Sequence, residues 1–287
     1  MLRLILLLAS VTPSQSLMDA QAQDAGIAAI AYRLQTSAVA LCDDVVPQSG
    51  VLFHDITQYP ASQRIAAKAA FGLDDRPSVL AVVTGSAADT SGLRVGDHIA
   101  DIDRQTPSTA RDAEAYLARA MASPPADIRV DRGGDRVSLV LTGAPGCVSQ
   151  VQVIPGKTRN AVADGTYVQL TAPVIAEAKD DGELASIIAH EMAHNILKHR
   201  AWLNKHGRTV RNIRTTEIEA DRLSVYLVAS AGYDSMAPAR FWTHFGKKTG
   251  QGIFSDGTHL RTKARVALLT AVAGDVAANK SFKPNLF

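Results

Sequence analysis

The chain has 287 residues, of which 46% are hydrophobic and 20% are charged. This length is sufficient for two domains of ordinary size, and this composition argues against a disordered chain. A formal net charge of +2 gives no reason to expect binding to nucleic acid or to an anionic membrane surface. We therefore expect a folded protein with no nucleic-acid partner, whose membrane association is at most peripheral.

Residues 1–22 have the layout of a secretory signal peptide. Arg3 supplies a positive charge, residues 4–11 are apolar apart from one serine, and small residues at 14–16 or 20–22 offer cleavage sites. The apolar run is too short to span a bilayer. An apolar helix buried in the fold is the alternative. The pattern predicts an exported protein, most simply a periplasmic protein of a bacterium.

The sequence contains two cysteines, Cys42 and Cys147. In an exported protein an isolated pair usually forms a disulfide, and this pair would tie the N-terminal helix to the end of the first domain. Two free buried thiols are the alternative. We expect the disulfide.

Residues 23–70 are predicted to form an N-terminal segment that is mainly helical. Apolar residues recur at three- and four-residue steps between residues 22 and 42, which is the period of a helix packed on one side. Pro47 and Gly50 break this pattern. Beyond them, residues 51–56 predict a short strand and residues 62–71 an alanine-rich helix.

Residues 71–143 predict a β-rich domain with strands at 78–83, 98–103, 128–131 and 137–141, a helix at 109–121, and turns at 85–88 and 92–97. This order, with the run from Gly85 to Ala88 and that from Gly92 to Ile99, resembles the PDZ domains of exported bacterial proteases. The resemblance implies docking of a peptide beside an apolar groove, with residues 71–73 cupping its carboxylate. Asp74 and Asp75 would repel that carboxylate, so docking of an internal segment or of the following domain is the alternative.

Residues 150–280 predict a second, mostly helical domain. Strands are expected at 151–154 and 167–170, and helices at 181–198, 215–231 and 263–273, with residues 144–146 as the linker. The predicted fold class is therefore α+β.

The segment His190-Glu191-Met192-Ala193-His194 carries the chemistry. On a helix His190 and His194 lie one turn apart and project from the same face, so both can reach one metal ion. Glu191 is rotated about 100° from His190, which suits a general base that is not a ligand. A surface helix with two incidental histidines is the alternative that this motif alone leaves open.

A third ligand is expected on the next predicted helix. Glu217 and Asp221 are one turn apart there and share a face. Glu217 can bind the metal, while Asp221 can accept the Nδ1 proton of a ligand histidine and fix its tautomer. Glu219 lies on another face and is expected to be a solvent-facing charge.

Together with residues 160–165, 183–185 and 231–234, these motifs resemble peptidase family M48, a gluzincin family, in its soluble exported branch. The resemblance covers residues 151–273. It implies a zincin-type fold, one Zn²⁺ per chain with Glu217 as third ligand, and an edge strand within residues 160–170 that holds the substrate backbone.

The family's Thr-His-Pro motif corresponds to Thr258, His259 and Leu260, followed by Arg265, with leucine in place of proline. By this resemblance His259 either polarises the scissile carbonyl or caps the zinc. A loop histidine of no consequence is equally open.

The other polar residues near the motif are expected to have simple roles. His199 would lie at the basic end of the motif helix and complement its dipole. Residues 204–214 hold several basic side chains and predict a solvated, mobile lid. A lipid-binding surface is the less favoured alternative, because the segment has few apolar anchors. His54, His98 and His244 have no partner at ligand spacing.

The sequence thus predicts a zinc metalloendopeptidase that acts on misfolded or misassembled envelope proteins. A PDZ-type binding or chaperone protein, with a capped or vestigial metal site, is the alternative. A structural zinc site is disfavoured because such sites use four protein ligands, commonly cysteines, and neither cysteine is near the motif.

Overall fold

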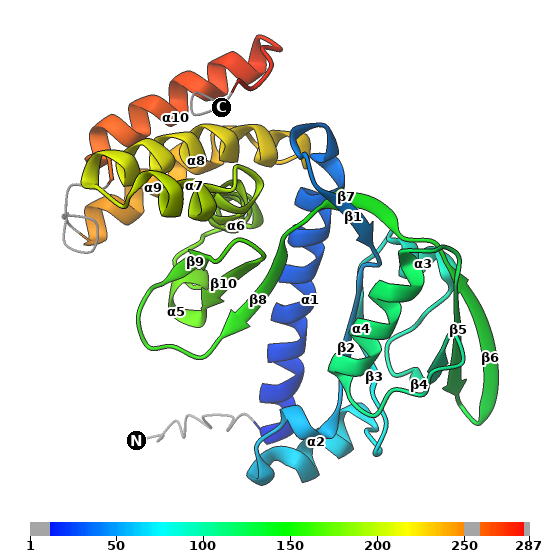
Figure 1. The fold of residues 1–287 in the computed structure, drawn as a ribbon. Coiled ribbons are helices and arrows are strands. Elements are labelled where there is room, and N and C mark those ends of the chain that lie inside the picture. The colour runs from blue at the N-terminus through cyan, green and yellow to red at the C-terminus, as the bar shows by residue number, and fades with distance from the viewer. Residues whose placement is uncertain (1–11, 250–258, 284–287) are drawn as a thin grey trace, which may run out of the picture. The chain divides into compact units, whose positions relative to one another are not determined.

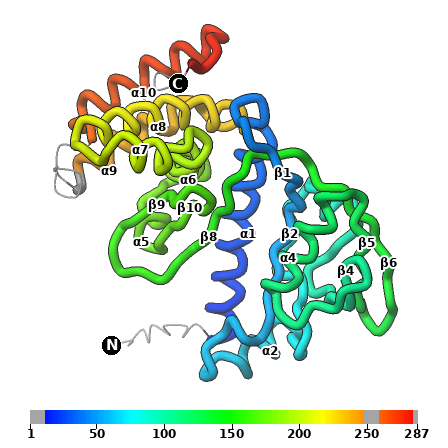
Figure 2. Tube along the Cα trace, viewed as in Figure 1, coloured from blue at the N-terminus to red at the C-terminus, as the bar shows by residue number. Residues whose placement is uncertain are grey.

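The computed structural model describes residues 12–249 and 259–283, which divide into two compact units (Figures 1 and 2). The first unit takes the chain up to Gly26 together with Ser49–Gly143, and the second takes Ile27–Gln48 together with the chain from Ala144 onward. The mixture of helices and strands agrees with the predicted α+β class. The first unit also includes residues 49–70, which were predicted to belong to a separate N-terminal segment.

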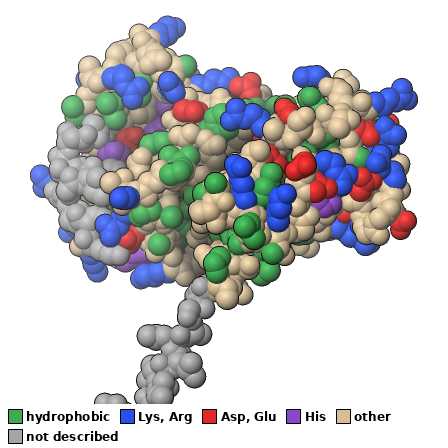
Figure 3. Space-filling model, turned by 90° about the horizontal axis from the view of Figure 1, so that it is seen from below, with side chains coloured by type: hydrophobic (Ala, Val, Ile, Leu, Met, Phe, Trp, Pro, Cys, Tyr) green, Lys and Arg blue, Asp and Glu red, His purple; other side chains and the backbone are tan. Residues whose placement is uncertain are grey.

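Helix α1 (Pro13–Ser37) contributes residues to both units. Residues 1–11 of the predicted signal peptide lie outside the described residues, and residues 13–22 belong to α1. Among the described helices, none is both long and apolar enough to cross a bilayer. On the face seen in Figure 3, both basic and acidic side chains are present.

The first unit is built on a five-stranded antiparallel sheet with the order β2-β3-β4-β5-β6. Its strands are β2 (Val51–His54), β3 (Ser78–Val82), β4 (His98–Ile102), β5 (Ala126–Arg132) and β6 (Asp135–Leu141). The β5–β6 hairpin turns at Gly133 and Gly134, which both have positive φ. All four strands predicted for residues 71–143 are present.

Three helices accompany this sheet: α2 (Arg64–Phe71), α3 (Ala87–Ser91) and α4 (Ala110–Met121), with 3₁₀ turns at Ile56–Gln58 and Ala61–Gln63. The hydroxyl of Thr109 caps α4 by accepting from the N–H of Asp112, whose carboxylate accepts from the N–H of Thr109 in return. The turn predicted at residues 85–88 is present at its start, where the N–H of Ser86 bonds to the carbonyl of Val83, and it leads directly into α3, which Ser86 caps.

Residues 71–73 join the end of helix α2 to the connection that precedes β3. Phe71 is the last residue of α2 and packs on the His54 ring, and Gly72 closes the helix in the left-handed conformation. Asp74 binds Arg76 and lies near Nδ1 of His98. The charge of Asp74 is thus already compensated within the unit.

The second unit contains two small sheets. In one, β8 (Gln150–Ile154) pairs in parallel with β10 (Tyr167–Thr171), and β9 (Ala161–Ala163) pairs antiparallel on the other side of β10. In the other, β1 (Val45–Gln48) pairs antiparallel with β7 (Ala144–Cys147). The two units divide at Gly143 and Ala144, where the predicted linker begins, but residues 144–146 form part of a strand, with Pro145 opposite Pro47 in a paired ribbon. A disulfide joins Cys42 to Cys147 at this ribbon, with Cα atoms 5.6 Å apart.

The helices of the second unit enclose its core. They are the part of α1 from Ile27 onward, α5 (Ala172–Ile175), α6 (Asp181–Ile196), α7 (His199–His206), α8 (Val210–Ser230), α9 (Ala237–Thr249) and α10 (Thr262–Ala277), with a 3₁₀ turn at Val39–Leu41. Helix α6 packs against α8, α9 and the β8-β10-β9 sheet. Helices α7 and α9 were not predicted, and residues expected to form a mobile basic connection are helical except at 207–209.

Candidate metal centre

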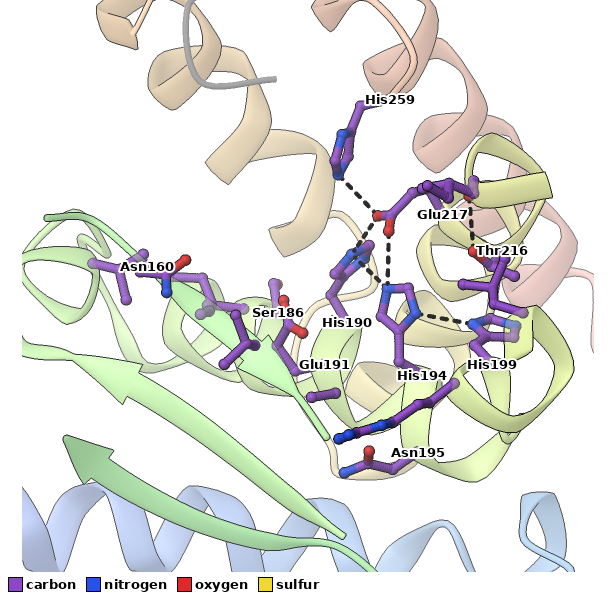
Figure 4. Close-up of a pocket in the computed structure, with 18 of the residues that line it drawn as sticks. Asn160, Ser186, His190, Glu191, His194, Asn195, His199, Thr216, Glu217 and His259 are labelled. Carbon is purple, nitrogen blue, oxygen red and sulfur yellow. Dashed lines mark hydrogen bonds and ion pairs between the residues drawn. The ribbon is translucent and has the colours of Figure 1, made fainter. Parts of the chain in front are cut away.

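Helix α6 carries His190, Glu191 and His194 toward one pocket (Figure 4). The opposite side of the helix is apolar, with Ile188 and Met192 fully buried. Packing of that side into the core fixes the rotation of the helix, so the two histidines share an orientation.

The first turn of α6 is also held by a buried carboxylate. Oε2 of Glu183 accepts a hydrogen bond from the backbone N–H of Lys179 and lies 2.9 Å from Nε2 of His244 on α9. The side chain of Glu183 is 3% exposed. His244, for which no role was predicted, therefore ties α9 to the start of the motif helix.

The side chain of Glu217 on α8 meets the two histidines. Nε2 of His190 lies 3.3 Å from Nε2 of His194 and 3.2 Å from Oε2 of Glu217. Oε1 of Glu217 lies 3.5 Å from Nε2 of His194. Around zinc at about 2.05 Å, tetrahedral ligands lie about 3.3 Å apart. The three donors thus have the chemistry and the spacing of a zinc site that leaves one position open.

His190 is oriented by a second buried carboxylate. Oδ1 of Asp221 lies 3.0 Å from Nδ1 of His190, so it can accept the proton that leaves Nε2 free to bind a metal. Oδ1 of Asp221 also accepts hydrogen bonds from Arg265 on α10, and the guanidinium of Arg265 lies 3.5 Å from the centre of the Trp242 ring. The predicted pairing of Asp221 with a histidine is the arrangement observed, and Arg265 completes it.

His194 is oriented by a residue whose role the sequence analysis misjudged. Nδ1 of His194 lies 3.0 Å from Nδ1 of His199, and Nε2 of His199 lies 3.8 Å from Oε2 of Glu219. His199 and Glu219 are each 1% exposed at the side chain. The expectations of a helix-end charge for His199 and a solvent-facing charge for Glu219 are therefore wrong. The available signal was a histidine five residues after His194 and a glutamate between Glu217 and Asp221.

The electrostatics of the site favour a positive charge between the carboxylates. Burial alone would lower the pKa of His190, but its hydrogen bonds to Asp221 and Glu217 outweigh burial and raise that pKa to about 10. Burial would raise the pKa of Glu217, yet the neighbouring histidines hold it well below its usual value. A metal ion bound at Nε2 of His190 would displace this proton, because a ligand imidazole must be neutral.

His259 also points into this site. Its Nε2 lies 3.0 Å from Oε2 of Glu217, so the ring approaches the carboxylate from the side away from α6 (Figure 4). Its side chain is 18% exposed. The structure thus places His259 within reach of the predicted metal position. Thr258, which precedes it in the motif, lies outside the described residues.

The pocket that holds these residues has a volume of about 630 Å³. Strand β9 forms one wall, α6 the floor, and aromatic residues of α9 contribute another wall. Glu191 lines the same pocket as the three metal-binding candidates (Figure 4). A cavity of this size is in the range of small-molecule sites, so it can take several side chains of a peptide.

Strand β9 presents a free edge to this pocket. The N–H of Thr171 bonds to the carbonyl of Asn160, and the N–H of Asp164 bonds to the carbonyl of Tyr167. Because hydrogen-bonded pairs alternate along an antiparallel ladder, the backbone N–H and C=O groups of Ala161 and Ala163 face away from β10. The predicted edge strand is therefore residues 161–163, whereas 167–171 is the central strand of its sheet.

The family model described as peptidase family M48 matches residues 129–210. The match contains His190, Glu191 and His194, and it supports a metallopeptidase of that family. Families of this kind are typically zinc-dependent. No curated protein matches the sequence.

Proposed function

We propose that the protein is a zinc-dependent endopeptidase with its active site between α6, α8 and strand β9. The observation that carries this proposal is the convergence of three ligand atoms, from His190, His194 and Glu217, within 4.8 Å of one another. The family match and Glu191 in the same pocket support it.

Each residue of the centre has a defined task. His190, His194 and Glu217 would hold the ion, and bound zinc would supply a Lewis acid that acidifies water and polarises a carbonyl. The Glu191 carboxylate accepts the proton of the attacking water and later delivers it to the leaving amine. Asp221 keeps the proton of His190 on Nδ1. His259, whose Nε2 lies beside Glu217, either donates a hydrogen bond to the scissile carbonyl oxygen or caps the zinc at the coordination position that the three ligands leave open.

The substrate is a polypeptide in extended conformation. The free N–H and C=O groups of Ala161 and Ala163 can pair with such a backbone, as when a strand is added to a sheet edge. Ala161 and Ala163 line the pocket beside Glu191. A bound strand would therefore pass in front of the catalytic carboxylate.

We further propose that the protein is exported and acts on misfolded or misassembled proteins of the envelope. The charge and apolar pattern of residues 1–22 supports export. The disulfide between Cys42 and Cys147 also fits an oxidising compartment. The PDZ-like sequence pattern of residues 71–143 is the proposed docking module for such substrates.

The substitution Glu191→Gln tests the proposed chemistry. It preserves the shape of the side chain but removes the base, so the variant should bind one zinc per chain yet cleave an unfolded protein such as casein at least about 10²-fold more slowly. Zinc is measured by metal analysis and cleavage by gel or fluorescence assay, with chelated wild type as the second control. Equal cleavage by variant and wild type would exclude Glu191 as base. Absence of cleavage by zinc-loaded wild type would favour the binding or chaperone alternative.

A further inference from the structure

His199 and Glu219 form a buried pair beside the metal centre that the proposed mechanism does not use. His199 is the first residue of α7, and Glu219 lies in the middle of α8. Both side chains are 1% exposed. Burying an ionisable pair costs free energy unless the groups have partners, so its position next to a candidate ligand calls for a physical reason.

The contact between the two histidine rings determines which ring donates. Nδ1 of His194 and Nδ1 of His199 lie 3.0 Å apart, a hydrogen-bond distance (Figure 4). Nε2 of His194 faces Glu217 and His190. A neutral imidazole that uses Nε2 as a metal ligand carries its proton on Nδ1. His194 is therefore the donor, and His199 accepts through Nδ1.

An accepting Nδ1 places the proton of His199 on Nε2. That atom faces Oε2 of Glu219 at 3.8 Å. A carboxylate at this distance stabilises the ring dipole that has its N–H end toward it. Glu219 thus favours the tautomer in which His199 can accept from His194.

The two candidate ligand histidines are consequently held in different ways. His190 donates its Nδ1 proton to the carboxylate of Asp221, which Arg265 holds in place. His194 donates instead to the neutral ring of His199, and the carboxylate of Glu219 lies on the far side of that ring. In each case the outer partner fixes the ring plane and the tautomer of the inner one.

We propose that His199 and Glu219 are positioning residues that orient His194 for zinc, His199 through its hydrogen bond to the His194 ring and Glu219 through the effect of its charge on the His199 ring. This inference rests on the proposed metal site. It assigns both residues to zinc affinity rather than to packing alone. The role of His199 and Glu219 thus differs from that of Glu191, which acts on the attacking water and not on a metal ligand.

Matched substitutions of His199 test this role. His199→Leu removes the acceptor, and His199→Asn keeps one because Oδ1 of asparagine occupies the place of Nδ1. The zinc dissociation constant, measured by competition with a chelating dye, should rise about 10- to 100-fold in the leucine variant. The asparagine variant should bind zinc within a few-fold of wild type. Equal zinc affinity of the leucine variant and wild type would overturn the proposal, as would equal weakening of both variants.

A double-mutant cycle tests the link to Glu219. Glu219→Leu should weaken zinc binding less than His199→Leu, and the double variant should bind no more weakly than His199→Leu alone, because Glu219 acts through His199. If the two effects on zinc affinity are fully additive, Glu219 does not act through His199.

Long-range proton–nitrogen NMR spectra of the zinc-loaded wild type read the tautomer without any substitution. His199 should carry its proton on Nε2, and a proton on its Nδ1 would overturn the proposal. Glu217→Ala serves as the reference for the metal site itself. If Glu217→Ala binds zinc as tightly as wild type, the proposed metal site fails. If it loses zinc while His199→Leu retains wild-type affinity, the positioning role alone fails.

Discussion

Oδ1 of Asp221 lies 3.0 Å from Nδ1 of His190, and the same oxygen accepts a hydrogen bond from Nε of Arg265 at 2.9 Å. One carboxylate therefore orients a candidate metal ligand and compensates a buried guanidinium. The side chains of Asp221 and Arg265 are 3% and 2% exposed. The stability of the second unit and the orientation of a candidate metal ligand therefore both depend on Asp221.

Asp221→Ala should strongly destabilise the second unit even without metal. The substitution leaves Arg265 buried without its counter-charge, which costs about 3–5 kcal/mol of unfolding free energy. Trp202 and Trp242 both belong to this unit, so urea unfolding of chelator-treated protein can be followed by tryptophan fluorescence. The matched control is Asp275→Ala, because Asp275 pairs with Lys280 at 43% and 66% side-chain exposure. The control should lose less than about 1 kcal/mol. Equal losses in both variants would contradict the prediction.

Ala163→Pro should weaken substrate binding without removing the metal. Proline deletes the N–H that faces the free edge of β9, and it leaves the ladder to β10 intact. Loss of one backbone hydrogen bond to substrate should lower kcat/KM about tenfold. Zinc content should equal that of wild type.

Ala163→Ser is the matched control for this edge, because it adds a small side chain and keeps the N–H. It should cleave nearly as fast as wild type. If Ala163→Pro has the same kcat/KM as wild type, the substrate backbone does not pair with the N–H of Ala163.

The residues at helical spacing were predictable because they depend only on the geometry of one helix. The geometry of α6 alone predicts the shared orientation of His190 and His194 and the place of Glu191. The geometry of α8 alone predicts that Glu217 and Asp221 lie on one face. The strands of the first unit were likewise predictable, since turn residues such as Gly133 and alternating apolar residues mark them locally.

His199 could not be predicted because the helix was assumed to continue through it. Nine residues beyond His190, a continuous helix would place His199 about 180° away from the metal face. Helix α6 ends at Ile196, and Lys198 adopts a left-handed conformation with φ of 51° before α7 begins. That local turn brings His199 back to His194, and no glycine marks it in the sequence.

Glu219 was misjudged because one face of α8 was assumed to be exposed. Helix α8 packs against α6 and α7 and also against α9 and α10, so its faces are buried on several sides. Glu219 is 0% exposed in consequence. Similarly, Ala144–Cys147 forms a strand only because β1, a distant segment, pairs with it. Such burial and pairing depend on tertiary packing, which the local pattern does not contain.

Acidification should destabilise the first unit through His54. This ring is 2% exposed and contacts the Tyr59 hydroxyl, and burial lowers its pKa from 6.5 to about 4. Between these two pKa values the unfolded chain binds a proton that the folded chain does not, so stability falls as pH decreases from 6.5 toward 4. From pH 7 to pH 5 the expected loss is about 2 kcal/mol.

Hydrogen-exchange mass spectrometry of peptides from β2 to β5, corrected for intrinsic exchange rates, measures this loss. His54→Gln should show a pH dependence smaller by that amount, whereas His206→Gln, on an exposed residue of α7, should behave as wild type. A pH dependence of His54→Gln equal to that of wild type would exclude His54 as the cause.

Removal of the disulfide should destabilise the second unit. Cys42 and Cys147 are separated by 105 positions, and cross-linking a loop of that length restricts the unfolded chain by about 4 to 5 kcal/mol in the chain-entropy model. The double variant Cys42→Ala, Cys147→Ala should therefore lose about 2–5 kcal/mol of unfolding free energy, read by tryptophan fluorescence in urea. Wild type treated with a reductant should unfold at the same urea concentration as the variant. Alkylation of denatured, unreduced wild type should add no label by mass, and two labels per chain would show that the bond does not form.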